Sequence, residues 1–176
     1  MKFIPSLLLL AGTAFGAEPN IVYILADDMG YGDVAALNPE CGFPTPHLDR
    51  MASEGMIFTD AHTGSSCCTP TRYGILTGRY AWRTPLKSGV LSGYSGLMID
   101  TDRTTVATLL KEQGYATACI GKWHMGIDWP TVDGKAVKSR ATGPNVDYTS
   151  EITGGPLDVG FDHFFGLAGS LGMPPH

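Results

Sequence analysis

A thiol and a guanidinium lie close together in the stretch Cys68-Thr69-Pro70-Thr71-Arg72. Pro70 presets the first turn of a helix, so Cys68 is expected at the N-terminus of a helix over residues 70–77. The helix N-terminus and the Arg72 guanidinium both favour negative charge beside Cys68. The pattern predicts a reactive thiolate or a bound oxyanion, and a buried structural cysteine is the alternative. The neighbouring Cys67 is expected to have a packing role.

A second reactive group occurs further along the chain, where Lys122 and His124 flank Trp123. Beside Cys68 and Arg72, the Lys122 ammonium would bind a tetrahedral anion and the His124 imidazole would move a proton. Taken alone, the same residues indicate an exposed basic tip with an aromatic anchor.

Two adjacent carboxylates, Asp27 and Asp28, follow an apolar run near the start of the chain. Hard divalent ions such as calcium prefer oxygen ligands, so the pair is a candidate half of a calcium site. Two carboxylates are too few for a complete calcium shell, and the other ligands must come from elsewhere. A solvated turn is the alternative interpretation.

Predicted strands over residues 20–26, 56–62 and 115–120 precede these three groups. Helices are predicted over residues 48–54, with Thr45 as the cap, over residues 70–77, and over residues 105–113. Alternation of strands and helices indicates an α/β fold with a mostly parallel sheet flanked by helices. Ligands bind at the carboxyl edge of such sheets, so the three groups are expected to converge there.

Length and composition limit the class of protein. The chain has 176 residues, a formal charge of -5 and 43% apolar residues, which argues against disorder and against a nucleic-acid-binding arm. We expect one domain or part of a larger one. Residues 128–155 are polar without a clear period and are interpreted as an insertion or surface excursion. The end at His176 is expected to be a truncation.

Residues 1–16 have the features of an export signal, with Lys2 before an apolar run and small residues at the cleavage site. That run is too short to span a bilayer, so no membrane anchor is predicted. The rest of the chain, residues 17–176, is expected to be secreted or periplasmic. Disulfides are feasible in that compartment, although the spacing of the four cysteines does not define a pairing.

The motifs together resemble those of the sulfatase family, which has an alkaline-phosphatase-like fold. Residues 66–78, built on Cys-x-Pro-x-Arg, look like the family's first motif, and residues 114–124 are similar to its second. Segments 20–28, 45–49 and 160–166 also fit the family pattern. The resemblance covers nearly all of the chain after the export signal, as the N-terminal portion of a sulfatase catalytic domain.

The resemblance implies that a maturation enzyme oxidises Cys68 to formylglycine, which becomes the nucleophile. Asp27, Asp28 and the modified Cys68 would be ligands of a calcium ion. Arg72 would fix the aldehyde hydrate, Lys122 would bind the sulfate, and His124 would take a proton from the hydrate. An Asp-Asn pair, a further Lys and a His acid of the family cannot be assigned in this sequence.

The predicted activity is therefore the hydrolysis of sulfate esters, with sulfated carbohydrates as the preferred substrate class. One alternative is a hydrolase of the same fold that acts on phosphate or phosphonate esters. Another is an inactive, truncated fragment that only binds calcium or an anion.

Overall fold

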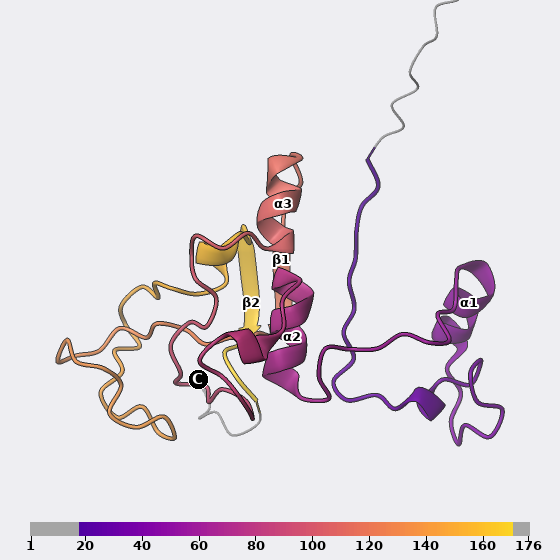
Figure 1. Ribbon diagram of the computed structural model, residues 1–176, viewed down its shortest axis with the longest axis horizontal. Helices are drawn as coiled ribbons and strands as arrows, with labels where there is room; N and C mark the ends of the chain where they lie inside the picture. Colours follow the sequence, from indigo (N-terminus) through magenta and orange to yellow (C-terminus); the bar gives the residue numbers. More distant parts are fainter. Residues whose placement is uncertain (1–17, 171–176) are drawn as a thin grey trace, which may run out of the picture. The chain divides into compact units, whose positions relative to one another are not determined.

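The computed structural model describes residues 18–170, which form two units, residues 18–56 and 57–170, described separately below (Figure 1). The export signal predicted over residues 1–16 lies outside the described residues and stays a prediction. None of the helices between residues 18 and 170 has the length and apolar character that a membrane span requires.

The first unit contains a helix, α1 (Pro46–Glu54), preceded by a single 3-10 turn, η1 (Tyr31–Asp33). Thr45 is the N-cap residue of α1, Pro46 occupies its first turn and Gly55 follows it, as the sequence predicts. The Thr45 hydroxyl donates to the Asp49 carboxylate at 2.8 Å and accepts from the Ala35 amide at 2.8 Å. These bonds connect the loop after η1 to the start of α1.

Residues 20–26 are extended but do not form the predicted strand. Val22 and Ile24 are 81% and 78% exposed, and no described residue of the unit pairs with this segment as a strand. A strand is stabilised by hydrogen bonds to a neighbour and by burial of its faces, and both are missing for these residues. The buried strand predicted from the β-branched composition is therefore not observed in the described first unit.

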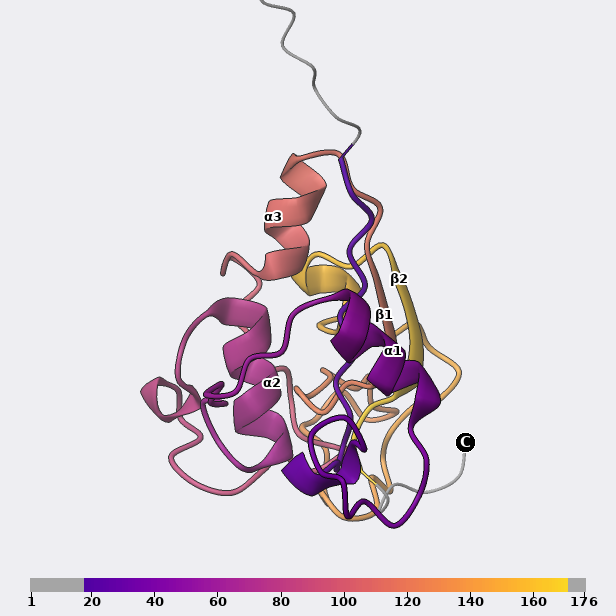
Figure 2. The ribbon, with the colours of Figure 1, turned by 90° about the vertical axis from the view of Figure 1, so that its right-hand side faces the viewer.

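The second unit contains the helices and strands that surround Cys68. In chain order they are α2 (Cys68–Thr77), η2 (Ala81–Arg83), α3 (Val106–Glu112), β1 (Ala118–Lys122), η3 (Leu157–Val159) and β2 (His163–Leu167). β1 and β2 pair in parallel, with Ala118 opposite His163 and Lys122 opposite Leu167. Helices α2 and α3 lie on one side of this pair (Figures 1 and 2). The predicted α/β class with parallel strands is confirmed.

Two predicted strands differ from the observed ones. Residues 56–62 are not a strand, and Phe58 is 71% exposed, because within the described chain no strand lies beside them. The strand predicted over residues 115–120 is observed as β1, which begins three residues later and ends two residues later than predicted. The shift arises because β2 begins at His163, whose partner in β1 is Ala118.

The core of this unit is built around Trp123, whose side chain is 1% exposed. Phe161 and Phe164 contact the indole edge-on, with ring centroids 6.3 and 6.5 Å away. The indole N–H donates to the Gly126 carbonyl at 2.7 Å, so its polar atom is satisfied in the interior. Edge contacts between aromatic rings stabilise this arrangement beyond the burial of area alone.

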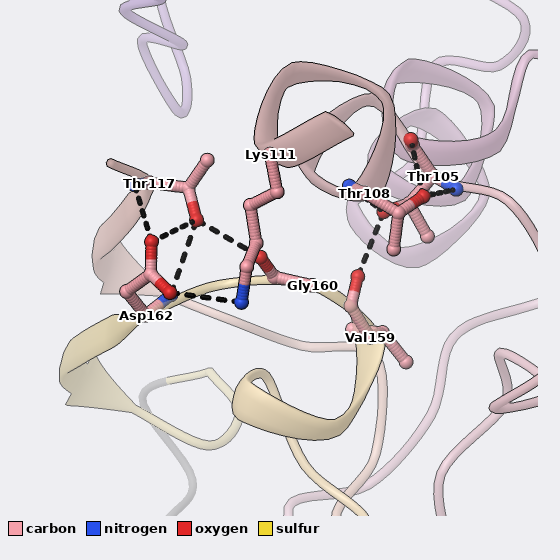
Figure 3. Close-up of polar contacts among 7 residues, drawn as sticks. All are labelled: Thr105, Thr108, Lys111, Thr117, Val159, Gly160 and Asp162. Carbon is pink, nitrogen blue, oxygen red and sulfur yellow. Dashed lines mark hydrogen bonds and ion pairs between the residues drawn. The ribbon is translucent and has the colours of Figure 1, made fainter. Parts of the chain in front are cut away.

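Threonine hydroxyls connect α3 and β1 to the segment that leads into β2 (Figure 3). Thr105, the N-cap of α3, donates to the Val159 carbonyl at 2.7 Å, and Thr117 donates to the Gly160 carbonyl at 2.9 Å. Gly160 has a φ of 112°, and a Cβ there would lie 2.7 Å from the Thr108 amide nitrogen. Only glycine allows this close approach of the two segments.

Asp162 completes this cluster and is expected to make the unit sensitive to acid. Its pKa is lowered to about 2, first by the ion pair with Lys111 at 2.8 Å and then by the Thr117 amide. The lowered pKa stabilises the fold above about pH 4, and this contribution is lost as the pH falls toward about 2.

We predict that Asp162→Asn unfolds at a lower temperature than wild type at neutral pH, and that the difference narrows below about pH 4. Thermal unfolding followed by circular dichroism across this range measures the effect. Asp102→Asn is the control, because Asp102 is exposed and outside the cluster. A difference between Asp162→Asn and wild type that is independent of pH would contradict the prediction.

Candidate active site

Cys68 is the first residue of α2, and its side chain faces the end of β1. Helix α2 begins two residues earlier than predicted, with Cys67 as its N-cap. The Lys122 ammonium lies 3.2 Å from the Cys68 sulfur and donates a hydrogen bond to it. The partial positive charge of the α2 N-terminus and the ammonium therefore act on the same atom. Both would stabilise an anion at this position.

β2 fixes the backbone that carries Lys122 and His124, because the parallel pairing continues past the end of β1. The Trp123 amide donates to the Leu167 carbonyl at 2.8 Å, and the His124 amide donates to the Ala168 carbonyl at 3.1 Å. Trp123 and His124 are only 1% and 2% exposed. The interpretation of this segment as an exposed basic tip is therefore wrong, because its two ring side chains are core residues.

His124 has a φ of 57°, which places its backbone in the left-handed region. Outside glycine this conformation is uncommon, and histidine is one of the residues that adopt it more often. Its Nε2 lies 2.7 Å from the Leu91 carbonyl oxygen, so the ring is held against the segment that precedes Ser92. The imidazole is thus fixed in orientation within the wall of the site.

Arg72 connects α2 to the end of β1. One guanidinium nitrogen donates to the Lys122 carbonyl oxygen at 2.5 Å. The Arg72 side chain therefore lies against the residue whose ammonium contacts Cys68. Cys68, Arg72, Lys122 and His124 come together in this unit, as the sequence predicts.

Thr69 is a further member of the site that sequence reasoning did not single out. Its side chain is fully buried, donates to the His124 carbonyl at 3.0 Å and accepts from the Leu91 amide at 3.2 Å. One hydroxyl thus joins α2 to two segments that are distant in sequence. Thr69 holds the backbone of His124 in place.

We predict that Thr69→Val lowers the free energy of unfolding by about 1–3 kcal/mol, because the variant leaves the Leu91 amide and the His124 carbonyl without this partner. Thr69→Ser keeps the hydroxyl and should lose much less. Urea denaturation of the purified variants measures the difference. Equal stability of the valine and serine variants would show that the hydroxyl is unimportant.

A cavity of about 530 Å³ opens beside Cys68, a volume suited to a small ligand. Its lining includes Cys68, Leu91, Ser92, Tyr94, His124 and Arg140. Burial, and then the hydrogen bond that its hydroxyl shares with the Tyr148 hydroxyl at 2.5 Å, raise the pKa of Tyr94 to about 12. The Tyr94 phenol therefore stays neutral at physiological pH.

The four cysteines are all free thiols. Cys67 is exposed, so its expected packing role is wrong: it precedes α2 as the N-cap residue and is not part of the core. Cys119 lies in β1, where burial raises the pKa of its thiol against the opposing effect of the Arg72 charge. Cys119 is thus a protonated structural thiol, and Cys68 is the cysteine beside the cavity.

Asp27 and Asp28 belong to the first unit, at the end of the extended segment 20–26. Asp28 is exposed, and the solvated turn and the half calcium site both stay open for this pair. Within each unit of the described chain, no three His, Cys, Asp or Glu side chains form a group that could hold a metal ion.

Comparison with known proteins gives the family of the chain. The family model described as Sulfatase matches residues 19–173, which include both units. The chain belongs to the sulfatase family. An N-acetylgalactosamine-6-O-sulfatase of Bacteroides thetaiotaomicron is 39% identical over 160 residues, 90% of this chain and 28% of that protein. Arylsulfatase A of Bos taurus is 44% identical over 125 residues, 69% of this chain and 24% of that protein.

Solved structures show the same relationship. A structure that concerns metabolism of multiple glycosaminoglycans by Bacteroides thetaiotaomicron matches with a TM-score of 0.72 and 40% identity, over 89% of this chain and 29% of that one. The Ps i-CgsB protein in complex with a neocarrahexaose matches with a TM-score of 0.58 and 28% identity, over 80% and 26% of the chains. The chain thus spans less than a third of the length of these sulfatase relatives.

Sequence reasoning missed the site residues that lie outside the sulfatase motifs or at their variable positions. Thr69 fills an unspecified position of Cys-x-Pro-x-Arg, and its hydroxyl has partners that only the tertiary structure reveals. Tyr94 and Arg140 come from segments without a periodic pattern. Arg140 lies in the polar stretch 128–155, where the sequence alone does not distinguish a site residue from a solvated surface side chain.

Proposed function

We propose that this protein hydrolyses sulfate esters through a formylglycine made from Cys68. The observation that carries the proposal is the position of Cys68 at the α2 N-terminus, 3.2 Å from the Lys122 ammonium and beside a cavity. Membership of the sulfatase family and the names of the relatives support the reaction class.

In the proposed site, the sulfur of Cys68 marks the position of the reacting oxygen. A hydrated aldehyde there would supply one oxygen that attacks sulfur and displaces the alcohol of the ester, and a second hydroxyl whose deprotonation would expel sulfate and restore the aldehyde. Lys122 binds the sulfate oxygens and stabilises the negative charge that develops on them. His124 accepts the proton from the second hydroxyl, and Arg72 orients the hydrate while holding the end of β1.

Asp27 and Asp28 are the proposed calcium ligands of the chain, together with the modified Cys68. Their carboxylates have the oxygen chemistry that calcium prefers, but a full shell has about six to eight oxygen atoms. A bound calcium ion supplies Lewis-acid polarisation of the sulfate oxygens.

Substitution of these carboxylates is predicted to weaken calcium binding. Asp27→Asn and Asp28→Asn should each lower calcium affinity by at least about tenfold, because each replaces a charged ligand with a neutral one. Isothermal titration calorimetry measures the calcium affinity directly, on the protein encoded by the longest reading frame that contains this chain. Asp102→Asn, an exposed carboxylate outside the proposed site, is the control. Unchanged affinity in both variants would remove these residues from the calcium site.

The proposed substrate is a sulfated carbohydrate. One relative is named an N-acetylgalactosamine-6-O-sulfatase, and another was solved with a neocarrahexaose, so both names concern sugars. The cavity of about 530 Å³ beside Cys68 is large enough for a saccharide unit. We propose that the protein is exported to the periplasm or out of the cell, and that a formylglycine-generating enzyme matures it. We propose no nucleic-acid partner and no membrane anchor.

Hydrolysis of matched aryl esters tests the reaction. The longest reading frame that contains this chain is expressed with a formylglycine-generating enzyme, and aryl sulfate and aryl phosphate are compared side by side. Faster turnover of the sulfate is expected, because the chain belongs to the sulfatase family and its named relatives are sulfatases. Faster turnover of a phosphate or phosphonate ester would favour that alternative class. Absence of turnover with every ester would favour the inactive fragment.

A further inference from the structure

The cavity beside Cys68 is also lined by a turn of the polar segment 128–155. Its lining residues include Cys68 and His124, and also Arg140 and Ala141 from this turn. The described residues that line the cavity include Arg140 as a permanent cation and no carboxylate. Because Arg140 lines the same cavity as Cys68, its charge is placed to contact a part of the substrate other than the scissile sulfate.

The turn that carries Arg140 has a defined structure of its own. The Ser139 hydroxyl accepts hydrogen bonds from the amides of Ala141 at 3.2 Å and Thr142 at 3.3 Å. The Gly143 amide donates to the Ser139 carbonyl at 2.8 Å and closes the turn. These bonds fix the backbone on both sides of Arg140.

The turn also packs directly on the cavity wall. Gly143 has a φ of 51°, and a Cβ at this position would lie 2.4 Å from the Tyr94 ring. At the base of the turn, the buried Asn145 amide donates to Asp133 at 2.8 Å and its oxygen accepts from the Lys138 amide at 2.8 Å. Tyr94 lines the same cavity, so the turn is held against it.

Arg140 and the nearby Lys138 differ in their ion pairs. Lys138 forms an ion pair with Asp133 at 2.7 Å. Within the described chain, Arg140 forms no ion pair with an acidic side chain, and its side chain is exposed at the cavity. A guanidinium with no carboxylate partner, on an ordered turn, is suited to an external oxyanion, since it can bind carboxylate or sulfate through two parallel hydrogen bonds.

We propose that Arg140 binds a second anionic group of the substrate while the scissile sulfate lies at Cys68 and Lys122. The chemical class is an oxyanion on the leaving saccharide, either the carboxylate of a uronic acid or a further sulfate. This inference rests on the proposed function. It makes Arg140 a residue that selects polyanionic saccharides over singly charged ones.

Three substrates separate the sources of the second charge. They are N-acetylgalactosamine 6-sulfate, its 4,6-disulfate, and the 6-sulfate joined to a glucuronate. The matured protein of the longest reading frame and its Arg140→Ala variant are compared by kcat/KM. With the substrate that carries the recognised second anion, we expect Arg140→Ala to lower kcat/KM by about tenfold to a hundredfold, mainly through a higher KM. The singly sulfated sugar should change by less than about twofold.

Two further variants are controls for charge and for folding. Lys135→Ala removes one positive charge from the same segment outside the cavity, and it should match wild type on all three substrates. Arg140→Lys keeps the charge without the bidentate geometry and should recover part of the lost affinity. Thermal unfolding verifies that all variants are folded.

Two results would overturn the proposal for Arg140. One is an equal loss of kcat/KM with all three substrates, and the other is no loss with either doubly charged substrate. If the wild-type protein hydrolyses no sulfate ester, the proposed function fails by itself. Calorimetric binding of the same sugars then tests Arg140, and equal affinities of wild type and Arg140→Ala for every sugar would refute its role.

Discussion

Replacement of Cys68 by serine is expected to lower kcat/KM for sulfate esters by at least about a thousandfold. Serine cannot supply the second oxygen of an aldehyde hydrate, so a sulfated serine would have no internal route to release sulfate. The position at the α2 N-terminus and the Lys122 contact would remain, because serine has a similar size. Steady-state hydrolysis of an aryl sulfate measures the loss.

Cys67→Ser is the matched control for this experiment. Cys67 is the adjacent thiol, it is exposed, and it is the N-cap of α2, a position that serine favours. This variant should keep wild-type activity. Mass spectrometry of the peptide that contains Cys68 should show the lower mass of the aldehyde in wild type and in Cys67→Ser. An unmodified thiol in an active preparation would refute the formylglycine mechanism.

Lys122→Met is expected to lower kcat/KM by about a hundredfold to a thousandfold, which is the range for removal of one group that stabilises developing charge. Methionine occupies a similar volume without the ammonium that lies 3.2 Å from the Cys68 sulfur. The backbone is unchanged, so the Lys122 carbonyl can still accept from Arg72. We therefore expect lost activity without a large loss of stability.

Lys122→Arg distinguishes charge from geometry at this position. A guanidinium keeps the positive charge but is wider, so partial activity is expected. Thermal unfolding and aryl sulfate hydrolysis are measured on the same preparations. A Lys122→Met variant that hydrolyses aryl sulfate at the wild-type rate would remove Lys122 from the sulfate site.

Local signals in the sequence predicted the helices well. Pro46 and Gly55 bound α1, and Thr105 caps α3, because caps and helix-breaking residues act within a few residues of their position. The same reasoning placed Cys68 at the start of α2. The motif residues Cys68, Arg72, Lys122 and His124 were predicted to meet, and they do in the second unit.

Features that depend on partners distant in sequence could not be predicted. Residues 20–26 have strand composition, yet a strand also requires a neighbour that supplies hydrogen bonds. β1 begins three residues later than predicted because its register with β2 determines where pairing starts. The roles of Thr69 and Arg140 follow from contacts across long sequence separations, which no local pattern encodes.

If Cys68 is matured to formylglycine as proposed, the burial of Thr69 has a consequence for the timing of that maturation. Once α2 has docked, Thr69 is inaccessible and Arg72 is bound to the end of β1. An enzyme that oxidises Cys68 in an extended segment must then act before these contacts form. Folding and modification become competing rates, and a chain that folds first is trapped with its thiol for the lifetime of the native state. The active fraction would record which process was faster.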